Sequence, residues 1–143
     1  LSFIEDLGAT HTINSRETAP AEAIQNVTGG GVEYAFECTS HPDVVKQAID
    51  AVRLGGTVVS TATSSADDFE IPPRAFTAGK QIVGNVGGSL HPSVDIPRFA
   101  KLAKSGQLPL NKLVSETYSL DQLDEAFEAI DEGNGIRGVI TQS

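Results

Sequence analysis

The chain has 143 residues and a formal net charge of −9, with 39% hydrophobic and 20% charged residues. This length is that of one ordinary domain, and the composition is typical of a globular protein and excludes an intrinsically disordered one. The acidic charge without any block of Lys or Arg argues against nucleic-acid binding, and no apolar run approaches the roughly 20 residues of a membrane-spanning helix.

The sequence begins without an initiator Met, in what we expect to be the end of an amphipathic helix. Leu1, Ile4 and Leu7 fall on one helical face, and Gly8 predicts the point at which this helix ends. The β-branched run at 10–13 then predicts a strand. Because a domain rarely begins with the tail of a helix, we expect further chain upstream of Leu1.

From there to residue 63, helix-length amphipathic segments alternate with short apolar runs. The pattern predicts a helix at 20–27, a strand at 32–40, a helix at 41–56 and a strand at 57–63. Pro42 suits the first turn of the second helix, and Gly55-Gly56 indicates its end.

The second half has a weaker pattern. It predicts a polar loop at 64–80 with an extended piece at 69–71, a strand at 81–88 that runs into a glycine turn, a helix at 93–106, an extended stretch at 112–118, a helix at 119–133 and a strand at 137–141. Ser119 and Gln122 have the spacing of a capping box at the start of the last helix.

Alternating strands and helices with nearly continuous apolar strands indicate an α/β fold, a doubly wound parallel sheet. Ligands bind such sheets beyond the carboxyl ends of the strands. Small and polar residues collect at three of those ends, at 37–40, 60–63 and 85–88. Two interpretations stay open: a flat ligand approaches the backbone there, or the residues are simply those that form turns.

Two charged residues, Glu37 and Arg137, have both a functional and a structural interpretation. Glu37 at a strand end is either an acid or base, or a hydrogen-bond acceptor for a neighbouring loop. Arg137, between Gly135 and Gly138, either clamps a phosphate or forms a surface ion pair. The single Cys38 excludes an internal disulfide and suits a reducing compartment, so we expect a cytoplasmic protein. No His has ligand spacing around Cys38, so no metal site is predicted in this chain.

Six motifs in order resemble the carboxy-terminal part of the medium-chain zinc-dependent alcohol dehydrogenases, over essentially the whole chain. They are LGATHTIN (7–14), GGGVEYAFECT (29–39), the Gly pair before TVVS (55–60), GNVGGS (84–89), PLNKLVSETYSLDQLDEAF (109–127) and GIRGVI (135–140). The resemblance implies a partial Rossmann-type fold: an incomplete NAD(P)-binding domain at 1–106, and a closing segment at 107–143 that packs on a catalytic domain. The zinc ligands, the G-x-G-x-x-G turn and the first two strands of that family's cofactor domain do not occur in this sequence.

The resemblance also implies that the two absent strands belong between the strand at 10–14 and the one at 32–38. Two strand edges would then be unpaired, and we expect the isolated segment to be poorly stable or to pair with another chain.

Carried over residue by residue, the resemblance implies a binding site for NAD or NADP. Its residues would be Cys38, Thr39, Thr61, Ala62, Thr63, Asn85, Val86, Gly87 and, on the pyrophosphate, Arg137. The piece at 69–71 matches the edge that pairs across the two-fold axis of a homo-oligomer. Ser40 stands where Gly is usual, and the Gly and Pro common after the strand before Thr61 are missing.

The predicted function is therefore part of an NAD(P)-dependent alcohol dehydrogenase that transfers hydride between an alcohol and the nicotinamide. This chain supplies no catalytic residue and no metal ligand, and zinc belongs to the full-length protein only. The alternatives are a fragment of a zinc-free quinone or enoyl reductase of the same superfamily, and a non-catalytic nucleotide-binding module. The substrate pocket and the acidic residue that chooses between NAD and NADP lie outside these motifs.

Overall fold

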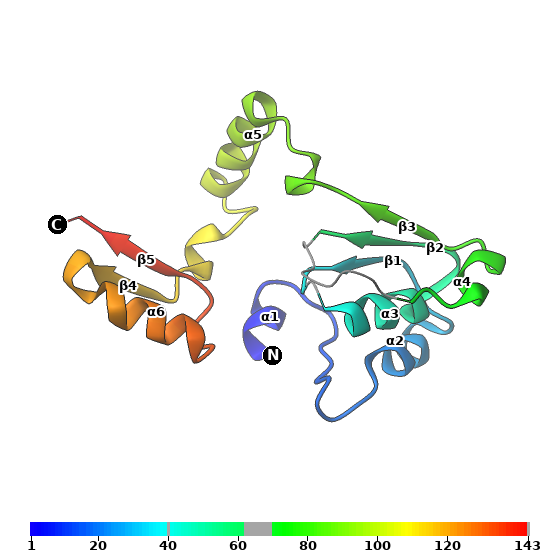
Figure 1. Ribbon diagram of the computed structural model, residues 1–143. Helices are drawn as coiled ribbons and strands as arrows, with labels where there is room; N and C mark the ends of the chain where they lie inside the picture. Colours follow the sequence, from blue (N-terminus) through cyan, green and yellow to red (C-terminus); the bar gives the residue numbers. More distant parts are fainter. Residues whose placement is uncertain (40, 62–69, 143) are drawn as a thin grey trace. The chain divides into compact units, whose positions relative to one another are not determined.

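Two parallel sheets lie in two separate units of the chain. In the computed structural model, which describes residues 1–39, 41–61 and 70–142, the chain divides into Leu1–Leu90 and His91–Ser143. The first unit holds a sheet of order β1-β2-β3 and the second a sheet of order β4-β5 (Figure 1). The strands are β1 (Val32–Glu37), β2 (Val52–Ser60), β3 (Gln81–Gly84), β4 (Glu116–Ser119) and β5 (Gly138–Thr141). Parallel pairing with helices between successive strands confirms the predicted α/β class.

The helices within the described residues fall largely where the apolar periodicity predicts them. They are α1 (Ser2–Asp6), α2 (Pro20–Thr28), α3 (Pro42–Ala51), α4 (Pro73–Thr77), α5 (Pro92–Lys104) and α6 (Leu123–Asp131), with short 3₁₀ turns η1 (Gly87–Ser89), η2 (Leu110–Leu113) and η3 (Leu120–Gln122). Prolines at the first helical position begin α2, α3 and α5. α2 ends at Gly29, whose left-handed backbone (φ 71°) an L side chain rarely adopts.

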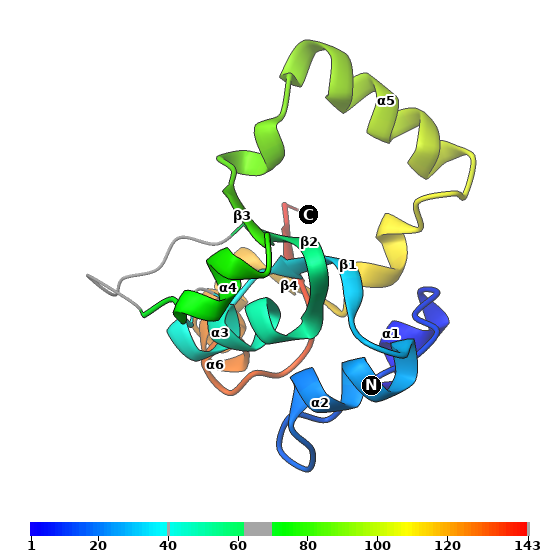
Figure 2. The ribbon, with the colours of Figure 1, turned by 90° about the vertical axis from the view of Figure 1, so that its right-hand side faces the viewer.

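The core of the first unit lies between α3 and the sheet. Val45 and Ile49 of α3 pack with Val52 and Val58 of β2 and with Ala75 of α4. α2 and α3 lie on the same side of β1 and β2 (Figures 1 and 2). This arrangement buries one face of the sheet under helices and leaves the strand ends accessible.

The boundary between α3 and β2 differs from the sequence-based expectation. The helix ends at Ala51 rather than at 56, and β2 begins at the next residue, because Val52 is extended (φ −78°, ψ 143°) and pairs with Val32 of β1. Residues 53–56 then bulge out of the ladder before Thr57 pairs with Tyr34. Gly56 has no room for a side chain, since a Cβ there would lie 2.9 Å from the Cβ of Val52. The glycine pair therefore marks a bulge within a strand and not the end of a helix.

The predicted strand at 10–13 is wrong. Residues 11–14 have no regular secondary structure, because a strand needs a ladder partner and none of the described residues pairs with them. The outer edge of β1 is likewise unpaired within the described chain. On β1 the alternation of side chains turns Ala35 toward the core and Tyr34 and Phe36 away from it, where they are 62% and 69% exposed.

Further boundaries differ from expectation. α4 lies inside the segment predicted as a loop, β3 ends at Gly84, before the glycine turn η1 that begins at Gly87, and η2 occupies the start of the predicted extended stretch. The strand predicted to reach 40 ends at Glu37. The remainder of the predicted loop, and Phe69 of the predicted dimer edge, lie outside the described residues; Glu70 and Ile71 directly precede α4.

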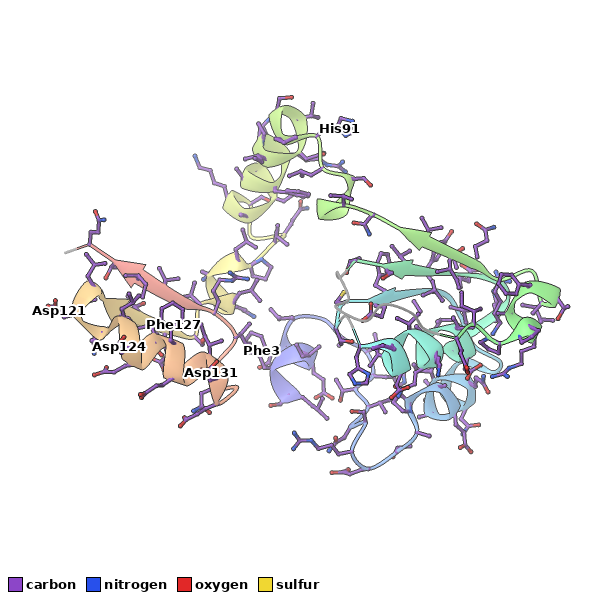
Figure 3. All side chains as sticks on the ribbon, in the orientation of Figure 1. Phe3, His91, Asp121, Asp124, Phe127 and Asp131 are labelled. Atoms are coloured by element: carbon purple, nitrogen blue, oxygen red, sulfur yellow. The ribbon has the colours of Figure 1, made fainter. Side chains whose placement is uncertain are left out.

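In the second unit, α6 follows a capping box and lies beside the β4-β5 pair. The Ser119 and Gln122 side chains form the predicted box on η3. Acidic side chains of η3 and α6 project into solvent, as Asp121, Asp124 and Asp131 do in Figure 3. The second unit begins at His91, next to the start of α5. The division at 106/107 concerns a different property, the packing of 107–143 on a catalytic domain, and it stays a prediction.

We predict that the 143-residue chain on its own is marginally stable and self-associates. Few of the described side chains are buried, one edge of β1 pairs with no described strand, and Tyr34 and Phe36 form an apolar face. Ordinary domains have a free energy of unfolding of about 5–15 kcal/mol, and we expect less than about 5 kcal/mol here. Urea unfolding and light scattering after size-exclusion chromatography measure both quantities.

Exchange of Tyr34 and Phe36 for Thr should reduce self-association. The same exchange at Leu54, which is 74% exposed in the bulge of β2, should leave self-association unchanged. A monomeric chain with a cooperative transition of ordinary stability would contradict the prediction.

Candidate functional site

The last residues of β1, β2 and β3 form one row across the sheet. Ser60 pairs with Glu37 on one side and with Gly84 on the other. The Thr61 backbone N–H and Oγ1 each donate to the Glu37 carbonyl oxygen at 2.9 Å, which continues the pairing beyond β2. The parallel sheet thus brings together three of the strand ends that the sequence singles out.

Asn85 links the end of β2 to the turn after β3. Its backbone N–H and its Nδ2 both donate to the Ser60 carbonyl at 3.3 Å, and its Oδ1 accepts from the Gly88 N–H at 2.7 Å. Gly88 has a positive φ of 71°, which glycine permits at little cost. The Asn85 side chain therefore holds a tight turn directly over the neighbouring strand end.

Glu37 is the charged residue that the structure buries among the residues it describes, at 2% exposure. Its Oε1 accepts from the Thr39 backbone N–H at 2.6 Å and from Thr39 Oγ1 at 2.7 Å, and its Oε2 accepts from Ser60 Oγ at 3.4 Å. These contacts support the second interpretation of Glu37, an acceptor for the loop that follows its strand.

The other candidate residues of the first unit surround this row. Cys38 is exposed and its Sγ lies 3.1 Å from Thr61 Oγ1. Val86 is 93% exposed, and a Cβ on Gly87 would meet no atom within 4 Å. Ala62 and Thr63 lie outside the described residues. The accessible backbone at Gly87 is what a flat ligand would need for close approach.

Arg137 lies in the second unit, just before β5, and its backbone is held by one serine. Ser115 Oγ accepts from the N–H groups of Ile136 (2.9 Å) and Arg137 (3.1 Å) and donates to the Arg137 carbonyl (3.2 Å), which also accepts from the Ser115 N–H (3.0 Å). Gly135 has a positive φ of 77°, and a Cβ there would lie 2.5 Å from Ser115 Oγ. The Arg137 side chain is exposed, and among the described residues no carboxylate forms an ion pair with it.

The described residues contain no cluster of three or more His, Cys, Asp or Glu side chains that could hold a metal ion. His41 instead caps α3, where its Nδ1 accepts from the Asp43 N–H at 3.3 Å. His91 donates its backbone N–H to Asp95 at the start of α5. No described helix is long and apolar enough to cross a membrane.

A cavity of about 570 Å³ lies elsewhere, beside the carboxyl end of α3. It is lined by Lys46, Asp50, Glu70, Ile71, Pro72, Pro73 and Arg74. Because α3 runs directly into β2, this cavity lies near the amino ends of the strands and not at the row of strand ends. Its charges are already paired in part, since Arg74 donates to Asp50 at 2.8 Å.

The sequence matches the zinc-binding dehydrogenase family over residues 1–105. The chain belongs to that family. Curated relatives of this chain include the geraniol dehydrogenase of Carpoglyphus lactis, 30% identical over 94% of this chain and 36% of the relative. The NDMA-dependent alcohol dehydrogenase of Amycolatopsis methanolica is 31% identical over 96% of this chain and 38% of its own length.

Solved structures agree with this assignment. The benzyl alcohol dehydrogenase of Acinetobacter calcoaceticus superposes with a TM-score of 0.93 and 31% identity, over all of this chain and 40% of that one. The chain spans little more than a third of the length of the curated relatives it matches. Its parallel sheets match the Rossmann-like part of such enzymes, as the resemblance in the sequence implies.

Sequence reasoning missed Ser115, and for Glu37 it gave the role of an acceptor for the following loop without naming the donors. Nothing in the motif at 109–127 singles out Ser115, which is far from Arg137 in the chain, and only the pairing of β4 with β5 brings the two together. The polar run after Glu37 was a usable signal, because a buried carboxylate at a strand end needs donors close by in the sequence.

Replacement Ser115→Ala should loosen the segment at 136–137. It removes the acceptor of two backbone N–H groups, and at about 1 kcal/mol per hydrogen bond we expect hydrogen exchange of these amides to accelerate about 5- to 30-fold. Amide exchange followed by mass spectrometry or NMR measures this.

Ser105→Ala is the matched control, because Ser105 Oγ only donates to the Leu102 carbonyl at the exposed end of α5. Unchanged protection of both amides in the Ser115 variant would show that the serine does not hold the Arg137 backbone.

Proposed function

We propose that this chain supplies part of the NAD(P)-binding site of a zinc-dependent alcohol dehydrogenase, and that the whole protein transfers hydride between an alcohol and the nicotinamide. The observation that carries the proposal is the row of hydrogen-bonded strand ends at Glu37, Ser60 and Gly84. In doubly wound sheets this edge is where dinucleotides bind. The family match and the names of the relatives support the reaction class.

The residues at this edge fit a flat, polar cofactor. Thr39, Thr61 and Asn85 present hydroxyl and amide groups beside backbone that Gly87 leaves open. Cys38 and Val86 add exposed apolar surface against which a ring can pack. When bound, the nicotinamide supplies hydride chemistry. The residues of this chain bind it, orient it and limit access of water.

Arg137 is proposed to contact the pyrophosphate. Its guanidinium has planar, paired donors that suit phosphate oxygens, and its exposed side chain has no ion-pair partner within the described chain. Ser115 and Gly135 fix the backbone from which it extends. Ala62 and Thr63 stay proposed cofactor contacts.

The remaining expectations are proposals as well. Zinc and the catalytic groups would come from parts of the protein outside this chain, because the described residues do not fit a metal site. A homo-oligomer formed through the 69–71 edge and a cytoplasmic location are proposed from the resemblance and from the single Cys38.

The test uses the full-length protein that carries this chain. We expect it to bind NAD or NADP, to contain zinc and to oxidise a member of a panel of primary and secondary alcohols. The 143-residue chain alone should oxidise none of them. Cofactor-dependent reduction of a quinone or an enoyl compound without bound zinc would favour the reductase alternative. Cofactor binding without turnover of any of these substrates would favour a binding module.

In the same protein, Arg137→Ala should raise the dissociation constant for the dinucleotide about 10- to 100-fold, because a charge-assisted hydrogen bond contributes about 1.5–3 kcal/mol. Arg137→Lys should recover part of the loss. Isothermal titration with NAD and NADP measures both.

Arg98→Ala provides the control for this prediction, as Arg98 is an exposed cation on α5 of the same unit. A dissociation constant that changes no more for the Arg137 variant than for the Arg98 variant would remove Arg137 from the site.

A further inference from the structure

Glu37 occupies an unusual place for a carboxylate. It is the last residue of β1, it is 2% exposed, and it pairs with Ser60 in the central strand. Burial of a charged group is costly unless hydrogen bonds compensate the lost water. The hydrogen-bond donors around Glu37 show which groups its side chain positions.

The Glu37 side chain binds the loop that follows its own strand. Oε1 accepts two hydrogen bonds from Thr39, one from the backbone N–H at 2.6 Å and one from Oγ1 at 2.7 Å. Both hydrogen bonds are short and both end on the same oxygen atom. The conformation of Thr39 therefore depends on where that oxygen lies.

The same residue also ties β1 to β2. Its Oε2 accepts from Ser60 Oγ at 3.4 Å, and its carbonyl oxygen accepts twice from Thr61 at 2.9 Å. Thr39 and Thr61 are both proposed cofactor contacts, and they follow the ends of two different strands, β1 and β2. Glu37 thus connects the two sides of the proposed site from beneath its surface.

We infer that Glu37 is a positioning residue for the dinucleotide: buried and itself out of contact with the cofactor, it fixes Thr39 against the end of β2. The inference rests on the proposed function. It differs from a purely structural role, because loss of stability would reduce the amount of folded protein without changing the cofactor affinity of the molecules that remain folded.

The decisive comparison is between Glu37→Gln and Glu37→Asp in the full-length protein. Gln keeps the length of the side chain, so its Oε1 can still accept from Thr39 and its Nε2 can donate to Ser60 Oγ. Asp keeps the charge but withdraws the oxygens by one methylene. Positioning predicts a cofactor dissociation constant within about threefold of wild type for Gln and raised at least about fivefold for Asp.

Glu37→Ala removes the side-chain contacts to Thr39 and to Ser60, and it should raise the dissociation constant of the cofactor about tenfold or more. The effect on the KM for cofactor should exceed the effect on kcat per folded molecule. Glu33→Ala is the control. Glu33 lies on the same strand in an exposed ion pair with Arg53, and its loss should leave cofactor affinity unchanged. Should the Ala variant not fold, the Gln and Asp pair decides alone.

Each result has one meaning. If the wild-type protein binds neither NAD nor NADP, the proposed function fails and this inference fails with it. If the wild type binds and all Glu37 variants bind equally well, or if Gln impairs binding more than Asp does, the inference alone is overturned. In the latter case the charge of Glu37, and not the position of its side-chain oxygens, determines cofactor affinity.

Discussion

The arrangement of the strand ends depends on the register in which β2 pairs with its two neighbours. Ser60 is opposite Glu37 and Gly84 at once, so that three strands end in one row. That register requires the bulge at 53–56, which takes up the residues between the pairing of Val52 and the pairing of Thr57. Gly56 makes the bulge possible, because its Cα packs against Val52 with no space for a methyl group.

Short-range hydrogen bonds position the segments that come directly after this row of strand ends. The carboxylate of Glu37 holds Thr39, and the amide of Asn85 holds the turn at Gly88. Each polar group acts on the chain two or three residues away or on the adjacent strand. The proposed cofactor site at this edge needs no deep cavity, and the cavity beside Arg74 lies elsewhere in the first unit.

Much of this could be predicted from the sequence, for physical reasons. The apolar periodicity of α3 and α6, Pro42, the capping box at Ser119 and the glycine at the end of α2 are local signals. They placed the beginnings of α3 and α6 and the end of α2 within a few residues. The strand ends were predictable as a group, since parallel strands present their carboxyl ends at one edge. The individual contacts were not, because the distance between Ser115 and Arg137 depends on a pairing that no local pattern specifies.

The two errors about strands have a common cause. Residues 10–13 have the composition of a strand but pair with no residue that the structure describes. Residues 53–56 lack that composition but lie within β2, between residues that do pair. Strand formation is a property of pairs of segments, and β-propensity describes only one of them.

The direct junction of α3 with β2 has a consequence for how this region can vary in length. Ala51 is the last helical residue and Val52 the first of the strand, so no connecting residue can absorb a change. One residue inserted there would either unwind the end of α3 or turn the side chain of Val52 to the other face of the sheet. Insertions and deletions among natural homologues should therefore avoid this junction and fall in segments such as 105–109, between α5 and η2.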